Sequence, residues 1–312
     1  MHVLITGGLG HIGSQLIRDF AKVDFIEKIR ILDNLSTQRY CSLFDLPDNA
    51  QYEFIEGDIL DEAQLNSAMN GIDAVIHLAA VTNAPETFSK KEKTEEVNFI
   101  GTKKVLEACK KNNIKKIIFP STTSVYGPTK GIAKEDCNPE DLKPQSPYAE
   151  FKLKAEKAII DKCKEGHLSG VVLRFGTVFG SSVGMRFHTA INKFIFLACS
   201  NRPLKVWKTA LNQKRPYLDL RDAVKAIVFM LEREKLNGEV YNVVTANMEL
   251  SETIDAIKEF IPGIKIEFTD SPLINQMSYF TDSEKLKKLG FGYTGNLRDG
   301  IKQTISLLNS LK

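Results

Sequence analysis

The sequence has no long apolar run, few cysteines and little excess charge, and each absence excludes a class of protein. No stretch reaches the roughly 18 apolar residues that a membrane-spanning helix needs, so we expect no membrane partner. The 42 basic and 39 acidic residues are spread along the chain and give a formal net charge of +3. Since no basic cluster carries interleaved aromatic residues, we expect no nucleic-acid partner.

The cysteines and histidines show no spacing typical of a metal site, and we expect no metal. An odd, scattered set of five thiols favours free cysteines in a reducing compartment. Strand-like sequence begins at Val3, which leaves no room for a leader peptide. We therefore expect a cytoplasmic protein. His77, in VIHLAA, is interpreted as a strand-end residue that faces a loop and not as a catalyst.

What is present is an alternation of short apolar runs with amphipathic segments over the first half of the chain. Apolar runs without polar alternation are typical of a parallel sheet covered on both faces. Their alternation with helical patterns predicts a doubly wound α/β fold with right-handed crossovers. The expected strands are His2–Thr6, Lys28–Asp33, Tyr52–Glu56, Ala74–Leu78, Lys116–Pro120 and Gly170–Arg174. The expected helices are Ile12–Ala21, Glu62–Met69, Glu92–Asn112 and Tyr148–Lys164.

After Arg174 the alternation ends, and the pattern predicts a smaller, mostly helical lobe. Glu239–Val244 is expected to return as a late strand of the main sheet. We assign residues 1–174 and about 219–244 to a nucleotide-binding domain, and 175–218 and 245–312 to a substrate lobe. Because no low-complexity linker separates them, the two parts should be interwoven. The expected helices here are Arg186–Ser200, Asp222–Arg233, Glu252–Phe260, Ser283–Leu289 and Leu297–Leu311.

A glycine-rich turn, TGGLGHIGS, follows the first strand and opens the first helix. Gly7, Gly10 and Gly13 allow the backbone to approach a pyrophosphate, and the helix N-terminus offers N–H groups to its charge. Asp33 lies twenty residues beyond Gly13, at the end of the second strand. A carboxylate there accepts hydrogen bonds from a ribose 2′-hydroxyl and repels a 2′-phosphate, so the pattern favours NAD over NADP in a Rossmann domain.

Tyr148 and Lys152 stand four residues apart on a predicted helix and therefore share a face. An ammonium near a phenol favours the phenolate, which could accept a proton from a sugar hydroxyl. An isolated pair of this kind is also common on helix surfaces. Here the hydroxyl-rich stretch Ser121–Gly127 follows a strand, where side chains point into the ligand crevice of a doubly wound sheet. Together with the glycine turn, the pattern indicates hydride transfer.

These residues resemble the extended short-chain dehydrogenases/reductases, specifically the NAD-dependent nucleotide-sugar epimerase/dehydratase family, with UDP-glucose 4-epimerase-like members and a subgroup of sugar 4-dehydrogenases. The resemblance covers nearly the whole chain. It is carried in order by TGGLGHIG, DNLS, GDI, HLAA, VNFIGT, STTSVYG, SPYAEFK, LRFGTVFG and KRPYLDLRD.

The resemblance implies roles for individual residues. Tyr148 would be the catalytic base, Lys152 its partner on the nicotinamide ribose, and Thr122 the residue that holds the reacting hydroxyl. Substrate contacts would come from Thr82, Thr123, Thr177, Arg186 and Arg215, the last on the substrate diphosphate. Besides Tyr148 and Lys152, contacts to NAD would come from Gly7, Gly10, His11, Ile12, Gly13, Asp33, Asn34, Asp58, Ile59, Leu78, Ala79, Ala80, Asn98 and Phe175.

The resemblance also implies a reaction class and an assembly. Dehydratases of the family carry an Asp-Glu pair where this chain has Thr123 and Ser124, so dehydration is disfavoured. We expect a nucleotide-sugar 4-epimerase that works through a transient 4-keto sugar. A 4-dehydrogenase or 4-keto reductase, and a non-catalytic NAD-binding regulator, remain open. Helical stretches Glu92–Asn112 and Tyr148–Lys164 match those that form a four-helix bundle in homodimers of the family.

Overall fold

A computed structural model of the chain describes residues 1–129, 131–166, 168–270 and 279–309. Its centre is a seven-stranded parallel sheet in the order β11-β7-β5-β4-β1-β2-β3. The predicted doubly wound fold is therefore confirmed. The strands are β1 (His2–Thr6), β2 (Lys28–Asp33), β3 (Gln51–Glu56), β4 (Ala74–His77), β5 (Lys116–Thr122), β7 (Ser169–Phe175) and β11 (Asn237–Val243).

The strand order reverses between β1 and β4, which pair with each other in parallel. From β1 the chain adds β2 and β3 on one side, and β4, β5, β7 and β11 on the other. At such a switch point the loops after the two central strands diverge and leave a crevice at the carboxyl edge of the sheet. The glycine turn follows β1 there.

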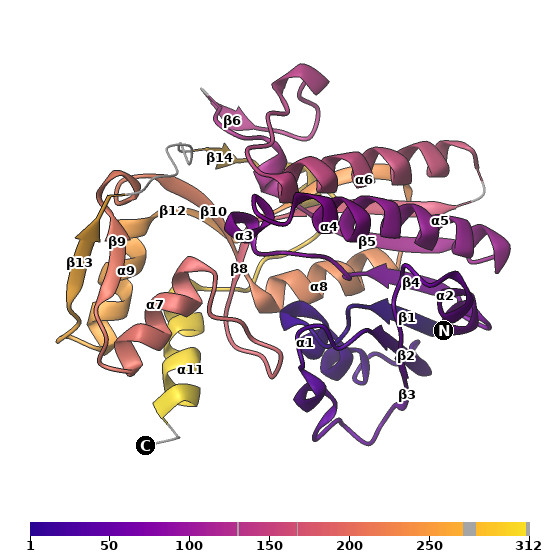
Figure 1. The fold of residues 1–312 in the computed structure, drawn as a ribbon, viewed down its shortest axis with the longest axis horizontal. Coiled ribbons are helices and arrows are strands. Elements are labelled where there is room, and N and C mark those ends of the chain that lie inside the picture. The colour runs from indigo at the N-terminus through magenta and orange to yellow at the C-terminus, as the bar shows by residue number, and fades with distance from the viewer. Residues whose placement is uncertain (130, 167, 271–278, 310–312) are drawn as a thin grey trace.

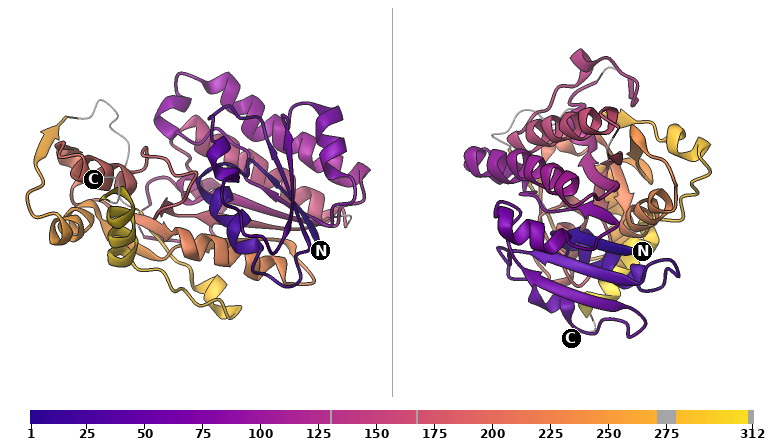
Figure 2. Two further views of the ribbon diagram at one scale, coloured as in Figure 1. Left: turned by 90° about the horizontal axis from the view of Figure 1, so that it is seen from below. Right: turned by 90° about the vertical axis from the view of Figure 1, so that its right-hand side faces the viewer.

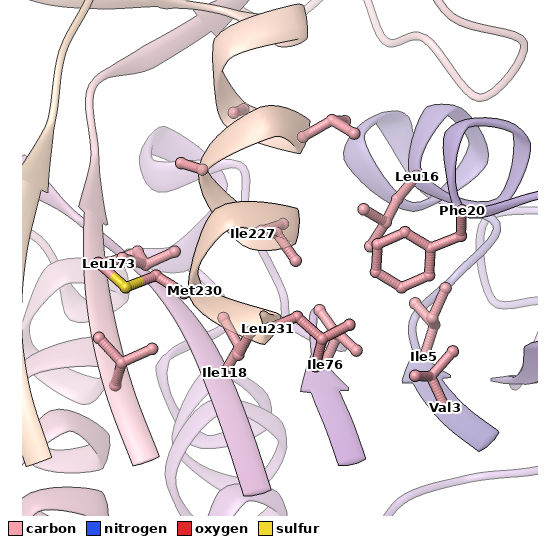
Figure 3. Close-up of a cluster of buried hydrophobic side chains, with 14 of the residues drawn as sticks. Val3, Ile5, Leu16, Phe20, Ile76, Ile118, Leu173, Ile227, Met230 and Leu231 are labelled. Atoms are coloured by element: carbon pink, nitrogen blue, oxygen red, sulfur yellow. The ribbon is translucent and has the colours of Figure 1, made fainter. Parts of the chain in front are cut away.

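Helices cover both faces of the sheet, as Figures 1 and 2 show. α1 (His11–Phe20) and α8 (Leu220–Leu231) lie on one face, and α2 (Glu62–Met69), α5 (Gly101–Lys111) and α6 (Pro147–Lys164) lie on the other. Figure 3 shows Val3 and Ile5 of β1 beneath Leu16 and Phe20 of α1. Leu4, between them, points to the opposite core. Both faces of the strand are thus apolar, which explains its unbroken apolar run.

The predicted helix Glu92–Asn112 is interrupted in the structure. α4 (Lys91–Glu95) leads into a π-helical turn, Glu96–Ile100, before α5 begins. A π turn inserts one extra residue per turn and changes which side chains point inward. It directs Asn98 into the protein, where its side chain bonds both the amide and the carbonyl of Val81. The pattern of apolar residues alone could not reveal this interruption.

The second part of the chain contains the predicted helices and several strands that were not predicted. α7 (Ala190–Cys199), α9 (Leu250–Phe260) and α11 (Leu297–Asn309) share one apolar core. The short strands around them carry too few alternating residues to be recognised. They are β8 (Thr177–Phe179), β10 (Lys214–Asp219) and β12 (Ala246–Glu249) in one sheet, and β9 (Leu204–Trp207) with β13 (Ile266–Thr269) in another.

Two further boundaries differ from the sequence prediction. α7 begins at Ala190 and not at Arg186; residues 186–189 are irregular, with bends at Phe187 and Thr189. α10 (Glu284–Lys288) is one residue shorter at each end than predicted. The described part of α11 reaches Asn309, and the rest of the predicted helix, up to Leu311, lies outside the described residues. Phe280–Thr281 (β14) pairs with Ile132–Ala133 (β6), and so joins the last part of the chain to the loop before α6.

No helix in the described ranges is both long and apolar enough to cross a membrane. Within the same ranges, no group of three or more His, Cys, Asp or Glu side chains could hold a metal ion.

His77, at the end of β4, is fully buried and does not face a loop as expected. Its Nδ1 lies 2.7 Å from Thr6 Oγ1 and its Nε2 lies 3.0 Å from Thr102 Oγ1, so the imidazole joins β1 to α5. Burial, with a smaller effect of the Lys152 ammonium, lowers the pKa of His77 to about 3. The folded protein therefore contains the neutral imidazole of His77 at neutral pH.

This burial predicts a pH dependence of stability. Between pH 6.5 and 3 the unfolded chain binds a proton that the folded chain does not, so stability falls as the pH decreases. Because of His77, the free energy of unfolding should decrease by about 2 kcal/mol when the pH is lowered from 7 to 5. Urea unfolding at several pH values should therefore give His77→Gln a shallower acid limb than the wild type. Parallel curves would contradict this role.

Candidate active site

A large cavity of about 1280 Å³ follows the carboxyl edge of the sheet and continues into the second part of the chain. All predicted site residues line it except Asn98 and Thr123. Asn98 instead braces the Val81 backbone, and the Thr123 hydroxyl lies 3.2 Å from the Tyr279 hydroxyl. Residues far apart in sequence thus meet in one elongated space, with β1 and β4 near one end and β10 near the other.

The glycine turn forms part of the cavity wall and fits a phosphate group. Gly7 has a φ of +68°, and a Cβ there would come within 2.6 Å of Ala79 Cα, so only glycine suits this contact. At Gly10 a Cβ would meet only Gly7 O, at 3.4 Å. Gly10 is also the N-cap of α1, and no side chain in the described part of the chain caps that helix. Its first N–H groups suit an anion.

Two carboxylates line the cavity beyond the glycine turn, Asp33 at the end of β2 and Asp58 after β3. The side chain of Asp33 accepts hydrogen bonds from the amides of Leu9 (3.1 Å) and Leu35 (3.0 Å). Burial raises the pKa of Asp33, and those two backbone bonds oppose the rise. Asn34 donates to Asp58 at 2.9 Å. A fixed carboxylate oxygen keeps a second lone pair, so Asp33 can also accept from ribose hydroxyls.

Tyr148 lies in the first turn of α6, where Ser146 caps the helix and Pro147 begins it. Its phenol hydrogen-bonds Thr122, the last residue of β5. Burial raises the pKa of Tyr148 to about 12; the bond to Thr122 opposes the rise, and the nearby Tyr279 adds to it. The protein alone therefore favours the neutral phenol, contrary to the expectation that Lys152 would lower its pKa.

Lys152 is only 3% exposed and lies one helical turn below Tyr148. Its Nζ donates to Pro120 O at 2.9 Å and lies 4.3 Å from the centre of the Phe119 ring. Burial lowers the pKa of Lys152 to about 7, and the charge of Glu156 opposes the change. The lysine therefore titrates in the range where enzymes exchange protons with substrates.

Glu156, whose charge acts on Lys152, belongs to a buried ion pair with Arg174. Glu156, one turn further along α6, accepts from Arg174 Nη2 of β7 at 2.7 Å and from the Ser121 hydroxyl. Glu156 and Arg174 are 1% and 4% exposed. The Arg174 guanidinium also lies 4.8 Å from the centre of the Tyr126 ring. Sequence reasoning missed the pair, although Glu156 continues the face of α6 that carries Tyr148 and Lys152.

The loop after β8 crosses over the glycine turn. Ser182 Oγ lies 2.8 Å from His11 Nδ1, and Gly184 N donates to Ser14 Oγ at 2.9 Å. A Cβ at Gly184 would come within 2.5 Å of Gly10 O, so the loop packs directly on the turn. Two residues further on, Arg186 donates to Thr82 Oγ1 at 2.9 Å. The loop thus brings Arg186 to the cavity wall.

The far end of the cavity is basic and partly aromatic. Thr177 of β8 and Arg215 of β10 both line it. Among the described residues of the lining, the acidic side chains are Asp33 and Asp58, both at the opposite end. This end suits a ligand with negative charge. Lining residues that the sequence prediction missed include Lys193, Lys205, Trp207, Gln213 and Tyr279.

Comparison with known proteins identifies the family. A model described as Epimerase, NAD dependent epimerase/dehydratase family, matches residues 3–244, well over half of the chain. The chain belongs to the NAD-dependent epimerase/dehydratase family. Its members are enzymes, and NAD is the cofactor that the glycine turn and Asp33 fit.

Two relatives and one solved structure illustrate the range of the family. A trifunctional UDP-glucose 4,6-dehydratase/UDP-4-keto-6-deoxy-D-glucose 3,5-epimerase/UDP-4-keto-L-rhamnose-reductase of Arabidopsis thaliana is 32% identical over 97% of the chain, which spans only 46% of that protein. The dTDP-D-glucose 4,6-dehydratase of Bos taurus is 31% identical over 97% of the chain and 87% of its own length. A UDP-glucuronic acid 4-epimerase from Bacillus cereus, solved with UDP-glucuronic acid and NAD, has a TM-score of 0.86 and 27% identity, with both chains fully covered.

Proposed function

We propose that this enzyme interconverts the C4 epimers of a nucleotide-diphosphate sugar. The observation that carries the proposal is the position of Tyr148 and Thr122. They lie between a cavity end that fits NAD and a basic end that suits a diphosphate, and the lining near them has no carboxylate among the described residues. Proton exchange by the phenol, and not acid–base work by paired carboxylates, is the chemistry that these side chains support.

In the proposed reaction Tyr148 Oη accepts the proton of the C4 hydroxyl while Thr122 Oγ1 orients that oxygen. NAD, when bound, supplies the acceptor of the C4 hydride and later its donor. The 4-keto sugar turns over in the cavity, hydride returns to its opposite face, and Tyr148 gives the proton back. Because the phenol is neutral in the protein alone, the charges of Lys152 and of the oxidised nicotinamide must stabilise the phenolate.

The same proposal assigns the remaining predicted contacts. Arg215 would hold the substrate diphosphate with a planar guanidinium, and Arg186, Thr82 and Thr177 would contact the substrate from the opposite wall. The Thr123 hydroxyl, predicted to contact the substrate, instead contacts the Tyr279 hydroxyl, and Thr123 does not line the cavity.

Dehydration is disfavoured even though two relatives above are 4,6-dehydratases in part or whole. Hydroxyls at Thr123 and Ser124 cannot protonate a leaving group and remove a carbon-bound proton as two carboxylates can. A 4-dehydrogenase or 4-keto reductase would use the same residues and differ in whether the ketone leaves. A non-catalytic NAD-binding regulator would not need Thr122, Tyr148 and Lys152 together.

We also propose a cytoplasmic homodimer. No disulfide joins any of the five cysteines, all of which are described, in keeping with a reducing compartment. α5 and α6 lie side by side on one outer face of the molecule (Figure 1), and Ile100 at the start of α5 is 38% exposed. A two-fold axis along this face would bring four helices together.

One assay tests the function. The purified protein is incubated with UDP-glucose, UDP-glucuronic acid, UDP-N-acetylglucosamine and dTDP-glucose, and products are separated by chromatography. Formation of a C4 epimer with only the NAD that co-purifies supports epimerisation. Stoichiometric NADH accumulation with a 4-keto product would instead establish a dehydrogenase. Retention of NAD without conversion of any nucleotide sugar would favour the regulator.

A further inference from the structure

Tyr279 lies between the basic end of the cavity and the turn Thr122–Ser124, which we call the catalytic turn because it carries Thr122. It is 6% exposed, lines the cavity and lies just before β14. We propose that Tyr279 is a positioning residue that fixes the catalytic turn relative to Arg215, with its hydroxyl acting on the turn and its ring on the arginine. This inference rests on the proposed function, since it assigns catalysis to the turn and substrate binding to Arg215.

The hydroxyl of Tyr279 contacts the turn that carries Thr122. Its oxygen lies 3.2 Å from Thr123 Oγ1, and Thr123 is only 1% exposed. Thr122 itself accepts from the Ser124 amide at 3.1 Å, so the turn has a fixed internal geometry. A buried hydroxyl that loses its partner must find another or move. The Tyr279 hydroxyl therefore fixes the direction of the residue next to Thr122.

The ring of Tyr279 contacts the arginine of the basic end. The Arg215 guanidinium carbon lies 5.3 Å from the ring centre, within the range of a cation–π contact. The amide of Tyr279 donates to Lys214 O at 3.4 Å, so the backbone is attached to β10 beside Arg215. Tyr279 thus contacts β10 through its backbone and Arg215 through its ring.

The phenol of Tyr279 also affects Tyr148, the proposed catalytic base. Burial is the main cause of the raised pKa of Tyr148, and the Tyr279 phenol raises it further. Burial also raises the pKa of Tyr217, two residues from Arg215 on β10; Arg215 and Thr253 oppose the rise, and Tyr279 adds to it. Tyr279 therefore lies near both Tyr148 and β10, the strand that carries Arg215.

Two substitutions separate the two contacts. Tyr279→Phe keeps the ring and loses the hydroxyl, and it should lower kcat about 3–10-fold, the effect of one hydrogen bond, with little change in KM. Tyr279→Leu also loses the ring, and it should weaken UDP binding and raise KM about tenfold, the effect of a partly buried cation–π contact. UDP affinity is measured by calorimetry, kcat and KM with the sugar that turns over, and the NAD content of each variant by absorbance.

Matched variants complete the test. Thr123→Val removes the other hydroxyl, so Tyr279→Phe/Thr123→Val should be no slower than either single variant. Tyr40→Phe removes an exposed hydroxyl outside the cavity lining and should match the wild type. A wild-type kcat for Tyr279→Phe, or equal UDP affinity for the Phe and Leu variants, would overturn the inference. Absence of conversion by the wild type would refute the proposed function instead, and UDP calorimetry would still report on the ring.

Discussion

Replacement of Tyr148 by Phe should abolish turnover and leave NAD binding intact. Proton transfer by a positioned side chain contributes about 10²–10⁴-fold to a rate, and here the phenol is the group that lies next to Thr122 at the end of β5. We therefore expect kcat to fall by about a thousandfold. Because only one oxygen is removed, the ring still fills its place in the cavity wall.

The control is Tyr52→Phe, which removes a hydroxyl on β3 outside the cavity lining. It should retain the wild-type rate. Both variants should carry the wild-type amount of NAD, measured by the absorbance of the nucleotide released on denaturation. A Tyr148→Phe protein that turns over at a rate near that of the wild type would refute the role of the phenol, whatever substrate is used.

Replacement of Arg174 by Met should destabilise the protein more than any substitution on its surface. The guanidinium and the Glu156 carboxylate form a pair that is almost fully buried, with additional bonds from Ser121. Removal of one partner leaves the other charge buried, which costs about 3–5 kcal/mol. Urea unfolding should show this loss as a lower midpoint with an unchanged slope.

The double variant Glu156→Gln/Arg174→Met tests whether the cost comes from the unpaired charge. With both charges removed, the buried site contains no uncompensated ion, so the double variant should be more stable than Arg174→Met alone. If both variants unfold at the same urea concentration, lost packing and not charge is the cause. The Glu156 charge raises the pKa of Lys152, so its loss in the double variant should lower that pKa and shift the pH dependence of kcat toward lower pH.

The main sheet and the cofactor end of the cavity could be predicted because their signals are local. Six short apolar runs gave six of the seven strands within one or two residues, and Glu239–Val244 gave the seventh. Gly7, Gly13 and Asp33 have a fixed spacing because one turn, the helix α1 and the strand β2 set it. The contacts of Gly7 with Ala79 and of Asp33 with Leu9 show why those residue types are needed.

The substrate end could be predicted less well because distant segments build it. Tyr279 is almost 160 residues from Thr123, which it contacts, and no local pattern connects them. Asn98 lies in a π turn and bonds the Val81 backbone without lining the cavity itself, and a helical wheel cannot show such a turn. The protonation of Tyr148 was also misjudged, because burial raises the pKa of the phenol and the hydrogen bond to Thr122 only partly opposes the rise.

The order of the elements along the chain has a consequence for synthesis on the ribosome. α8 and β11 complete the sheet and one of its two cores, but they follow a long excursion through β8, α7, β9 and β10. A nascent chain that has emerged only as far as Arg174 leaves the apolar side of β7 and β5 without Ile227, Met230 and Leu231. Such an intermediate would expose this surface to chaperones until roughly 70 further residues have been made.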